Sequence, residues 1–396
     1  RLFTSVSTLS ERGYIVESTP GEPNTATLAG LVAAPELSVQ SGFYDSAFSL
    51  DINTATPMAT IRYTLDGSIP DETSGELYLG PVRIDRTTVL RARAFRGGWR
   101  PSSDRVRTWL FPDDIINQNR ESALASGLPA SWRSRSADYG FDRRVIGQNR
   151  TDDFGGRYAG SIKSDLAELP SISLVMGVED LFGNQGIYSN PSGRGDAWER
   201  PVFAELVYPD GRQGFAERGG LRIQGGAFRT LSLKKSFRLS FRGKYGTSKL
   251  NYPLFGEDAT NEFDGIVLRA GGNDAWRWGG QETLYIRDAF TMETARSMGM
   301  VSSHTTFVHL YLNGHYWGLY NMVERPDASF SASYHGGNKE TWDAINQDST
   351  PDGNRDAWNR MRAVLNEGME TNEVYQRIQG KDPDGNRNMG FEDLLD

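Results

Sequence analysis

Two adjacent lysines that follow a glycine turn could hold the phosphates of a nucleotide. A strand-like stretch runs into Gly225 and Gly226, and Lys234 and Lys235 open the alternating stretch that follows. Backbone amides of a glycine turn can cover phosphate oxygens, while a lysine on the returning strand supplies the cation. The stretch is neither a Walker loop nor the glycine-rich signature of ordinary protein kinases. From the pattern alone, a plain hairpin with exposed lysines is the favoured interpretation.

Charged residues later in the chain could complete such a site. Arg287 and Asp288 precede Glu293 on one predicted helix, which could supply the carboxylate that orients a phosphate-binding lysine. Glu324 ends an aromatic strand just before Pro326, where strands give way to helices and clefts often form. A solvated helix face is favoured for the first group, and a surface position is equally compatible with Glu324.

Oxygen-bearing side chains alternate around a glycine near the end of the sequence, as they do in the first half of a Ca²⁺ loop. These side chains are Asp382, Asp384 and Asn386, around Gly385. Such a loop needs a bidentate Glu at its twelfth position. The residue there is Asp393, so a polar turn is favoured over a metal site.

Composition excludes several classes of function. The 396 residues include 43 Lys+Arg against 51 Asp+Glu, and the net charge of -8 argues against nucleic-acid binding through bulk phosphate attraction. The absence of Cys excludes a disulfide framework, a thiol nucleophile and Cys-ligated metal. A hydrolase is disfavoured because no Gly-x-Ser-x-Gly elbow occurs and the histidines lack the spacing of a zincin pair. No apolar run reaches ~18 residues, the length expected of a membrane span.

Strands separated by turns dominate the first part of the chain. Residues 1–33 combine a short alternating stretch with a linker containing Pro and Gly, which predicts the end of a preceding β module. Alternating stretches bounded by turn residues then predict a β-sandwich over 34–112. Residues 113–169 are polar and rich in Arg and Ser, so we expect a charge-mixed, solvated connector, part of which packs over a neighbouring domain.

Residues 170–396 carry strands first and helices second, which predicts a mixed α+β architecture. Helical spacing and a glycine stop signal predict a helix over 285–299. Asn313 and Gly314 predict a type I′ turn between two aromatic-rich strands. Apolar residues within 352–379 again recur at helical spacing.

Residues 170–396 resemble the spore coat protein H (CotH) kinase family, through the order and spacing of blocks that are each weak alone. The stretch 34–112 is similar to the chitobiase/hexosaminidase C-terminal module, an Ig/FnIII-like β-sandwich. Residues 1–33 resemble the end of a lamin-tail-like module. The blocks shared with the CotH family are RIQGG at 222–226, KKSFRLSF at 234–241, SKLNYPLFG at 248–256, VLRAGGND at 267–274, IRD at 286–288 and LYLNGHYWGLYNMVER at 310–325.

The resemblance implies an atypical protein-kinase-like fold and phosphoryl transfer from ATP, with Mg²⁺, to Ser residues of protein substrates. It also implies roles for residues of this chain. Lys235 is expected to be the nucleotide lysine with Lys234 as the adjacent choice, Gly225 the turn over the phosphates, and Arg287 and Glu324 residues that line the cleft.

The catalytic Asp and the metal-binding Asp of the family belong to two later motifs, an Asn-x-Asp segment and a Trp-Asp-x-Asp/Glu segment. The leucine-rich stretch that precedes these motifs begins at 391–396. We therefore expect both motifs beyond Asp396, a CotH-like domain truncated at its C-terminus, and no catalysis by the chain as given.

These observations together predict part of an exported bacterial multidomain protein, secreted or at the cell surface, whose kinase-like domain phosphorylates Ser when complete. The expected partners are a protein substrate or neighbouring surface proteins. The alternative is a non-catalytic structural or adhesive surface protein that uses the same domains as a scaffold. Trp276, Trp278 and Trp317 could then stack on sugars, although a core role is favoured for them.

Overall fold

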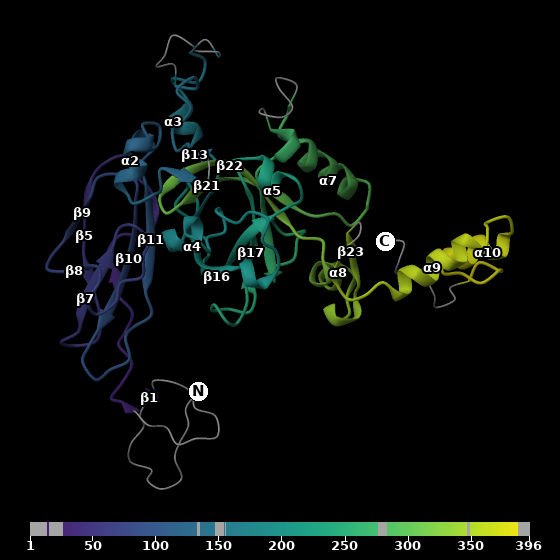
Figure 1. The fold of residues 1–396 in the computed structure, drawn as a ribbon, viewed down its shortest axis with the longest axis horizontal. Helices are drawn as coiled ribbons and strands as arrows, with labels where there is room; N and C mark the ends of the chain where they lie inside the picture. Colours follow the sequence, from purple (N-terminus) through teal and green to yellow (C-terminus); the bar gives the residue numbers. More distant parts are fainter. Residues whose placement is uncertain are drawn as a thin grey trace, which may run out of the picture. The chain divides into compact units, whose positions relative to one another are not determined.

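The computed structural model describes residues 14–15, 27–132, 135–146, 154, 156–275, 283–346 and 349–386. The chain divides into two compact units. Unit 1 comprises Arg1–Thr247 with Phe307–Tyr320, and unit 2 comprises Ser248–Thr306 with Asn321–Asp396. Figure 1 shows the elements of both units in the order of the sequence.

Some of the expectations concern residues outside the described ranges. They include most of the first strand and linker predicted within 1–33, Trp276, Trp278 and the leucine-rich stretch 391–396. Within 1–33 the structure describes β1 (Tyr14–Ile15), which pairs with β2 (Thr27–Leu28).

Short strands, antiparallel except for the parallel β4–β11 pair, form the sandwich-like module of unit 1, as the alternation predicts. One sheet has the order β4-β11-β10-β7-β8, while β3 pairs with β6 and β5 pairs with β9. Alternate side chains of a strand face the same side, so Trp109, Leu50 and Ile84 are buried in one core. The strands are β3 (Glu36–Leu37), β4 (Gly42–Phe43), β5 (Phe48–Leu50), β6 (Ile52–Asn53), β7 (Thr60–Thr64), β8 (Glu76–Leu77), β9 (Val82–Ile84), β10 (Thr88–Phe95) and β11 (Arg105–Leu110).

The connector is more structured than the expectation of a solvated segment, and part of it packs as predicted. Trp132 and Tyr139 are buried, and both rings contact Trp317 in an aromatic cluster. Their apolar rings outweigh the polar composition of the segment. Trp317 packs in this cluster but is only partly buried, so the favoured core role is confirmed only in part. The connector contains α1 (Pro112–Ile115), α2 (Arg120–Ala125), β12 (Ser131–Trp132), β13 (Arg135–Ser136) and α3 (Ile162–Asp165).

A second sheet of unit 1 has the order β21-β14-β15-β16-β17. Its neighbours are antiparallel except β14 and β21, which run parallel. The predicted turn is confirmed, since Asn313 and Gly314 have φ values of 47° and 80°. The elements are β14 (Ser171–Val175), α4 (Val178–Phe182), β15 (Arg200–Val207), β16 (Ala216–Gln224), α5 (Phe228–Leu231), β17 (Ser236–Ser240), β21 (Thr305–Leu312) and β22 (His315–Glu324).

Buried polar contacts join the sandwich to this second sheet within unit 1. Thr108 on β11 and Ser173 on β14 lie 2.8 Å apart between their hydroxyl oxygens. On β15, Glu205 Oε1 accepts a hydrogen bond from Ser41 Oγ at 2.7 Å and lies 3.4 Å from Nη1 of Arg107. Burial raises the pKa of Glu205 to about 7. The two modules therefore share a packed interface in which a carboxyl group is desolvated.

Unit 2 contains the helices expected late in the chain. The predicted helix over 285–299 is confirmed as α7 (Arg287–Ser297), but its expected apolar side is exposed, with Phe290 69% accessible. The helical pattern of 352–379 forms two helices, because Gly368 adopts a φ of 94° between them. The other elements are β18 (Leu250–Asn251), β19 (Glu262–Phe263), β20 (Gly265–Arg269), α8 (Ala328–His335), β23 (Ala344–Asn346), β24 (Ser349–Asp352), α9 (Asp356–Asn366) and α10 (Asn372–Ile378).

Across the described ranges, every helix is too short or too polar to span a lipid bilayer. The β-rich multidomain fold with an N-terminal sandwich-like module agrees with the fold class expected from the sequence.

Candidate functional site

The glycine turn lies at the open end of the β16–β17 pair. The last register pair is Gln224 with Ser236. Gly225 therefore begins the connection between the two strands, and Lys235 ends it. Gly225 adopts a φ of 109°, and a side-chain carbon added there would meet no atom within 4 Å. The space beside this turn is therefore open. The connection is longer than a plain hairpin because it contains the helical turn α5.

Lys235 is buried, which contradicts the interpretation of a hairpin with exposed lysines. Its side chain donates hydrogen bonds to the carbonyl oxygens of Arg229, at 2.6 Å, and Ser232. Burial, together with the charges of Arg135 and Arg229, lowers the pKa of Lys235 to about 8. Among the described residues no ion pair involves Lys235. The ammonium is thus held by carbonyl oxygens alone, without a compensating negative charge.

Lys234 lies on the other side of the strand, against the aromatic hairpin. Its Nζ donates a hydrogen bond to the carbonyl oxygen of Leu319 at 2.5 Å and lies 4.6 Å from the centre of the Tyr320 ring. Gly318 permits this approach, since a side-chain carbon there would lie 3.1 Å from Nζ. Burial lowers the pKa of Lys234 to about 8 as well. Both lysines therefore carry charges that the fold desolvates.

Arg229 supports this region, although no role was predicted for it. Its side chain is 5% exposed and donates hydrogen bonds to the carbonyl oxygens of Pro191, at 2.7 Å, Ile223, at 2.5 Å, and Gly193. The guanidinium thus fixes the segment at 191–193 to the end of β16. No spacing rule indicates this function, because α5 was not expected and all three acceptors are backbone atoms.

In unit 2, Glu324 is buried in a network of internal hydrogen bonds. Its Oε2 accepts a hydrogen bond from the backbone N–H of His304 at 2.7 Å and lies 2.8 Å from His304 Nδ1. Its Oε1 accepts a hydrogen bond from the hydroxyl of Tyr334 at 2.6 Å. Burial and the neighbouring carboxylate raise the pKa of Tyr334. The carboxylate is 2% exposed and occupied on both oxygens, so the surface interpretation of Glu324 is wrong.

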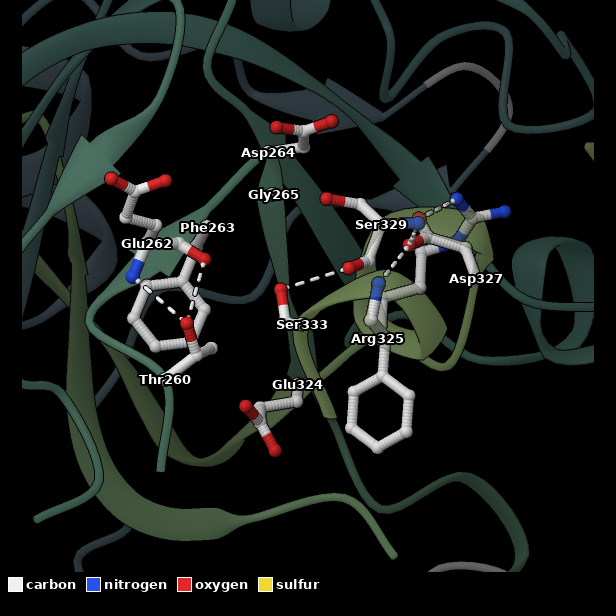
Figure 2. Close-up of a pocket in the computed structure, with 11 residues that line it drawn as sticks. Thr260, Glu262, Phe263, Asp264, Gly265, Glu324, Arg325, Asp327, Ser329 and Ser333 are labelled. Atoms are coloured by element: carbon white, nitrogen blue, oxygen red, sulfur yellow. Dashed lines mark hydrogen bonds and ion pairs between the residues drawn. The ribbon is translucent and has the colours of Figure 1, made fainter. Parts of the chain in front are cut away.

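The pocket beside Glu324 is small and is lined by several charged side chains (Figure 2). Its volume of about 20 Å³ suits a single water rather than a nucleotide. Asp327 caps α8 and lies 2.6 Å from Nη1 of Arg325, and Asp264 lies 2.8 Å from Nζ of Lys339. The lining residues are Thr260, Glu262, Phe263, Asp264, Gly265, Glu324, Arg325, Asp327, Ser329, Phe330 and Ser333.

Arg287 opens α7 with a side chain that is 61% exposed. Its Nε lies 3.3 Å from Oδ1 of the buried Asp274. Further along the helix, Glu293 is 66% exposed and pairs with Arg296, so the solvated-face interpretation is confirmed for Glu293. It does not orient a lysine in this unit.

Two of the candidate residues share unit 2 but lie apart. On the β20–β22 pair, Glu324 faces Ile266, whereas Arg269 faces Asn321 and pairs with Asp288 on α7. Three residues along a strand span about 10 Å. Arg287 and Glu324 therefore belong to opposite ends of this strand pair, while Gly225, Lys234 and Lys235 belong to unit 1.

Comparison with known families now assigns the region that contains all of these residues. The sequence model of the family described as CotH kinase protein matches residues 221–396. The chain carries a CotH kinase domain. A model described as the chitobiase/beta-hexosaminidase C-terminal domain matches residues 39–108, ahead of it. A search of curated proteins found no match.

The two matches confirm the resemblances to the CotH kinase family and to the chitobiase/hexosaminidase C-terminal module, whereas the lamin-tail-like resemblance of residues 1–33 stays a prediction. They fall inside the predicted ranges 170–396 and 34–112, whose ends stay predictions. Lys234 and Lys235, the strand β17 that follows them, the β16–β17 connection and the aromatic hairpin β21–β22 all lie within the CotH kinase domain.

Near the end of the CotH kinase domain, the expected polar turn is present. Asp382 Oδ1 accepts hydrogen bonds from the backbone N–H groups of Asp384, at 3.0 Å, and Asn386, at 2.8 Å. These hydrogen bonds lower the pKa of Asp382. Over the part of the chain that the structure describes, no three acidic or histidine side chains gather as a metal site would require.

Proposed function

We propose that the CotH kinase domain binds ATP through Lys235 and the adjacent Lys234, and that the complete protein transfers phosphate to Ser residues of protein substrates. The match to a CotH kinase protein family supports this proposal. The chitobiase-like module supports the further proposal that the protein acts outside the cell or at its surface. The partner is accordingly a secreted or surface protein that carries the acceptor Ser.

The observation that carries the proposal is the desolvated charge of Lys235. A buried ammonium without a neighbouring carboxylate costs free energy, and an anionic ligand removes that cost. Lys235 immediately precedes Ser236, the partner of Gln224, and Gly225 follows Gln224 beside open space. A phosphate at this turn could accept from backbone N–H groups and face the lysine, which is how nucleotide phosphates are generally held.

The lysines need a change of side-chain position to serve this role. Lys235 is 6% exposed and its Nζ faces the carbonyl oxygens of α5. Lysine side chains rotate about four bonds, so exchange of two carbonyl partners for phosphate oxygens needs no movement of β17. Charge-assisted contacts with phosphate are stronger than contacts with neutral carbonyls, which favours this exchange.

Arg287 and Glu324 enter the proposal in different roles. The exposed guanidinium of Arg287 at the start of α7 suits direct contact with a phosphate. Glu324 suits a positioning role, because both of its oxygens already hold His304 and Tyr334.

Mg²⁺ is part of the proposed reaction, but the described residues do not supply a site for it. They contain no group of three or more His, Asp or Glu that could hold a metal ion. No step of phosphoryl transfer is therefore assigned to residues of this chain. When bound, the metal ion would neutralise charge on the transferred phosphate.

Label transfer from ATP tests the proposed activity. The full gene product is incubated with γ-labelled ATP, Mg²⁺ and a Ser-rich protein acceptor, beside Lys235→Met and Lys163→Met variants. Methionine keeps the apolar stem of a lysine but removes its charge, and Lys163 is a half-exposed control in the connector. We expect label on Ser with the parent and the control, and a loss of at least about tenfold with Lys235→Met. Absence of label with the parent, or full activity in Lys235→Met, would contradict the proposal.

A scaffold without catalysis is the second candidate, and one observation favours it. Lys235, Arg229 and Glu324 each make internal hydrogen bonds that stabilise the fold without any ligand. In that case Lys235→Met would lower thermal stability, and the parent would bind no nucleotide.

A further inference from the structure

A second pocket lies in unit 1, between the chitobiase-like module and strand β16. Its volume is about 580 Å³, which is within the range of small-molecule sites. Its lining residues do not include Lys234, Lys235 or any residue of β17 or α5. They are Leu31, Val32, Ala33, Ala34, Ile69, Arg93, Arg100, Pro101, Ser102, Ser103, Asp104 and Arg218.

Positive charge dominates this lining. Arg93 on β10, Arg100 just after it and Arg218 on β16 contribute three guanidinium groups, and Asp104 contributes one carboxylate. Three positive charges and one negative charge leave an excess of two positive charges. Sequence spacing gives no hint of this cluster, because Arg218 comes from a different module.

The single carboxylate is already committed to other partners. Asp104 is only 6% exposed at its side chain, lies 2.5 Å from Nε of Arg91 and pairs with Arg218. No ion pair involves Arg93 or Arg100 within the described ranges. Two of the three guanidinium groups are therefore not held in an ion pair in the described part of the chain.

The environment of Arg93 would favour an anionic ligand. Its Nε donates a hydrogen bond to the carbonyl oxygen of Ser102 at 2.8 Å, which fixes the side chain at the pocket. Burial lowers the pKa of Arg93, and the charges of Arg91 and Arg100 add to this effect. Asp71 and Glu72 offset only part of it. An anion in the pocket would relieve this repulsion.

We propose that this pocket, which we call the arginine pocket, binds a phosphate group, either free or as a monoester, through Arg93, Arg100 and Arg218. A phosphate monoester carries a charge of about -1.5 to -2 at neutral pH, which balances the excess charge of the lining. Arginine forks match phosphate geometry. Leu31 and Ile69 offer an exposed apolar wall for the group that carries the phosphate. The described lining contains no aromatic side chain, which disfavours a neutral sugar.

The phosphate could come from free phosphate or from phosphoserine on a protein, and titration calorimetry separates these sources. The chain is titrated at low ionic strength with inorganic phosphate, with O-phosphoserine and with acetate. We expect one saturable site for both phosphates and none for acetate. Tighter binding of phosphoserine identifies the ester as the ligand through the apolar wall, whereas equal affinity identifies the free ion. Both results support the proposal.

Charge-matched variants show where the phosphate binds. Arg100 is exposed and Arg93 is half-buried, so Arg100→Gln retains the fold and Arg93→Gln provides a second test. Each is expected to weaken phosphate binding about tenfold, the value of a charge-assisted hydrogen bond. Arg86→Gln removes the same charge from a 73% exposed side chain outside the pocket and should leave affinity unchanged.

Three results would overturn the inference. They are no saturable phosphate binding by the parent chain, equal competition by acetate, or equal losses in Arg86→Gln and Arg100→Gln. The inference is independent of the proposed nucleotide site, because Lys235→Met should leave phosphate affinity at the arginine pocket unchanged.

Discussion

At the scale of single residues, the side chain of Lys235 is held in a buried position, which disfavours its positive charge. The residues responsible come from α5, which lies between the glycine turn and β17. For Lys234 the partner is Leu319, far along the sequence. The sequence could predict the adjacent lysines and the glycines, but it could not predict their burial, because the burying atoms are backbone carbonyls of distant or unexpected segments.

Nucleotide affinity should depend on pH through these lysines. Their pKa values of about 8 mean that each loses its proton as pH rises from 7 to 9. Only the protonated amine attracts phosphate, so affinity should fall about tenfold or more over this range, whereas exposed lysines would hold it constant. Binding of a fluorescent ATP analogue at pH 7, 8 and 9 measures the slope. A flat profile would show that neither lysine contacts the phosphates.

Glu324 should stabilise unit 2 through its buried hydrogen bonds. Glu324→Gln removes the charge and places an N–H₂ group against a donor, which should cost about 1.5–3 kcal/mol of unfolding free energy. Urea denaturation measures this cost. Glu293→Gln is the matched control, because Glu293 is 66% exposed. Equal stability of both variants would contradict the buried network.

At the scale of elements, the periodicity of apolar residues predicted the strands and helices whose formation depends on local sequence. The alternating strands, the Asn313–Gly314 turn and α7 agree with expectation. The helix α7 itself was predicted correctly. Phe290, which was expected on its apolar side, is nevertheless exposed in the structure. The connector was misjudged because its composition is polar, while Trp132 alone joins a cluster of four other aromatic rings.

The contact between β11 and β15 should make unit 1 sensitive to pH. Glu205 faces Ser41, Thr108 and Ser173 and has Arg107 as its charged neighbour. Its pKa rises from 4.5 to about 7, so the folded chain binds more protons than the unfolded chain between these values. Stability from this group is therefore present below pH 4.5 and is lost as pH rises to 7.

Urea denaturation at pH 5 and pH 7.5 measures this dependence. Glu205→Gln stays neutral and should abolish the part of the slope that this carboxyl group causes. Glu121→Gln is a control, since Glu121 is exposed on α2. An identical slope in the parent and in Glu205→Gln would show that the interface does not hold a protonated carboxyl group.

At the scale of the whole molecule, the chitobiase-like module belongs to the same compact unit as the first strands of the CotH kinase domain. Val89 and Val106 of the sandwich pack against Val175 of the second sheet. The module therefore does more than space its neighbours, because it supplies part of the core around β14. A single sequence shows both modules but not the packing between them.

The proposed kinase function depends most directly on nucleotide binding by Lys235. Equilibrium titration of ATP into the parent chain and into Lys235→Met, with Lys163→Met as a control, measures it at pH 7. We expect saturable binding of ATP by the parent chain. The affinity should weaken at least about tenfold in Lys235→Met and stay unchanged in the control, and both variants should be folded. No binding by the parent chain, or equal affinity in the parent and Lys235→Met, would contradict the proposed function.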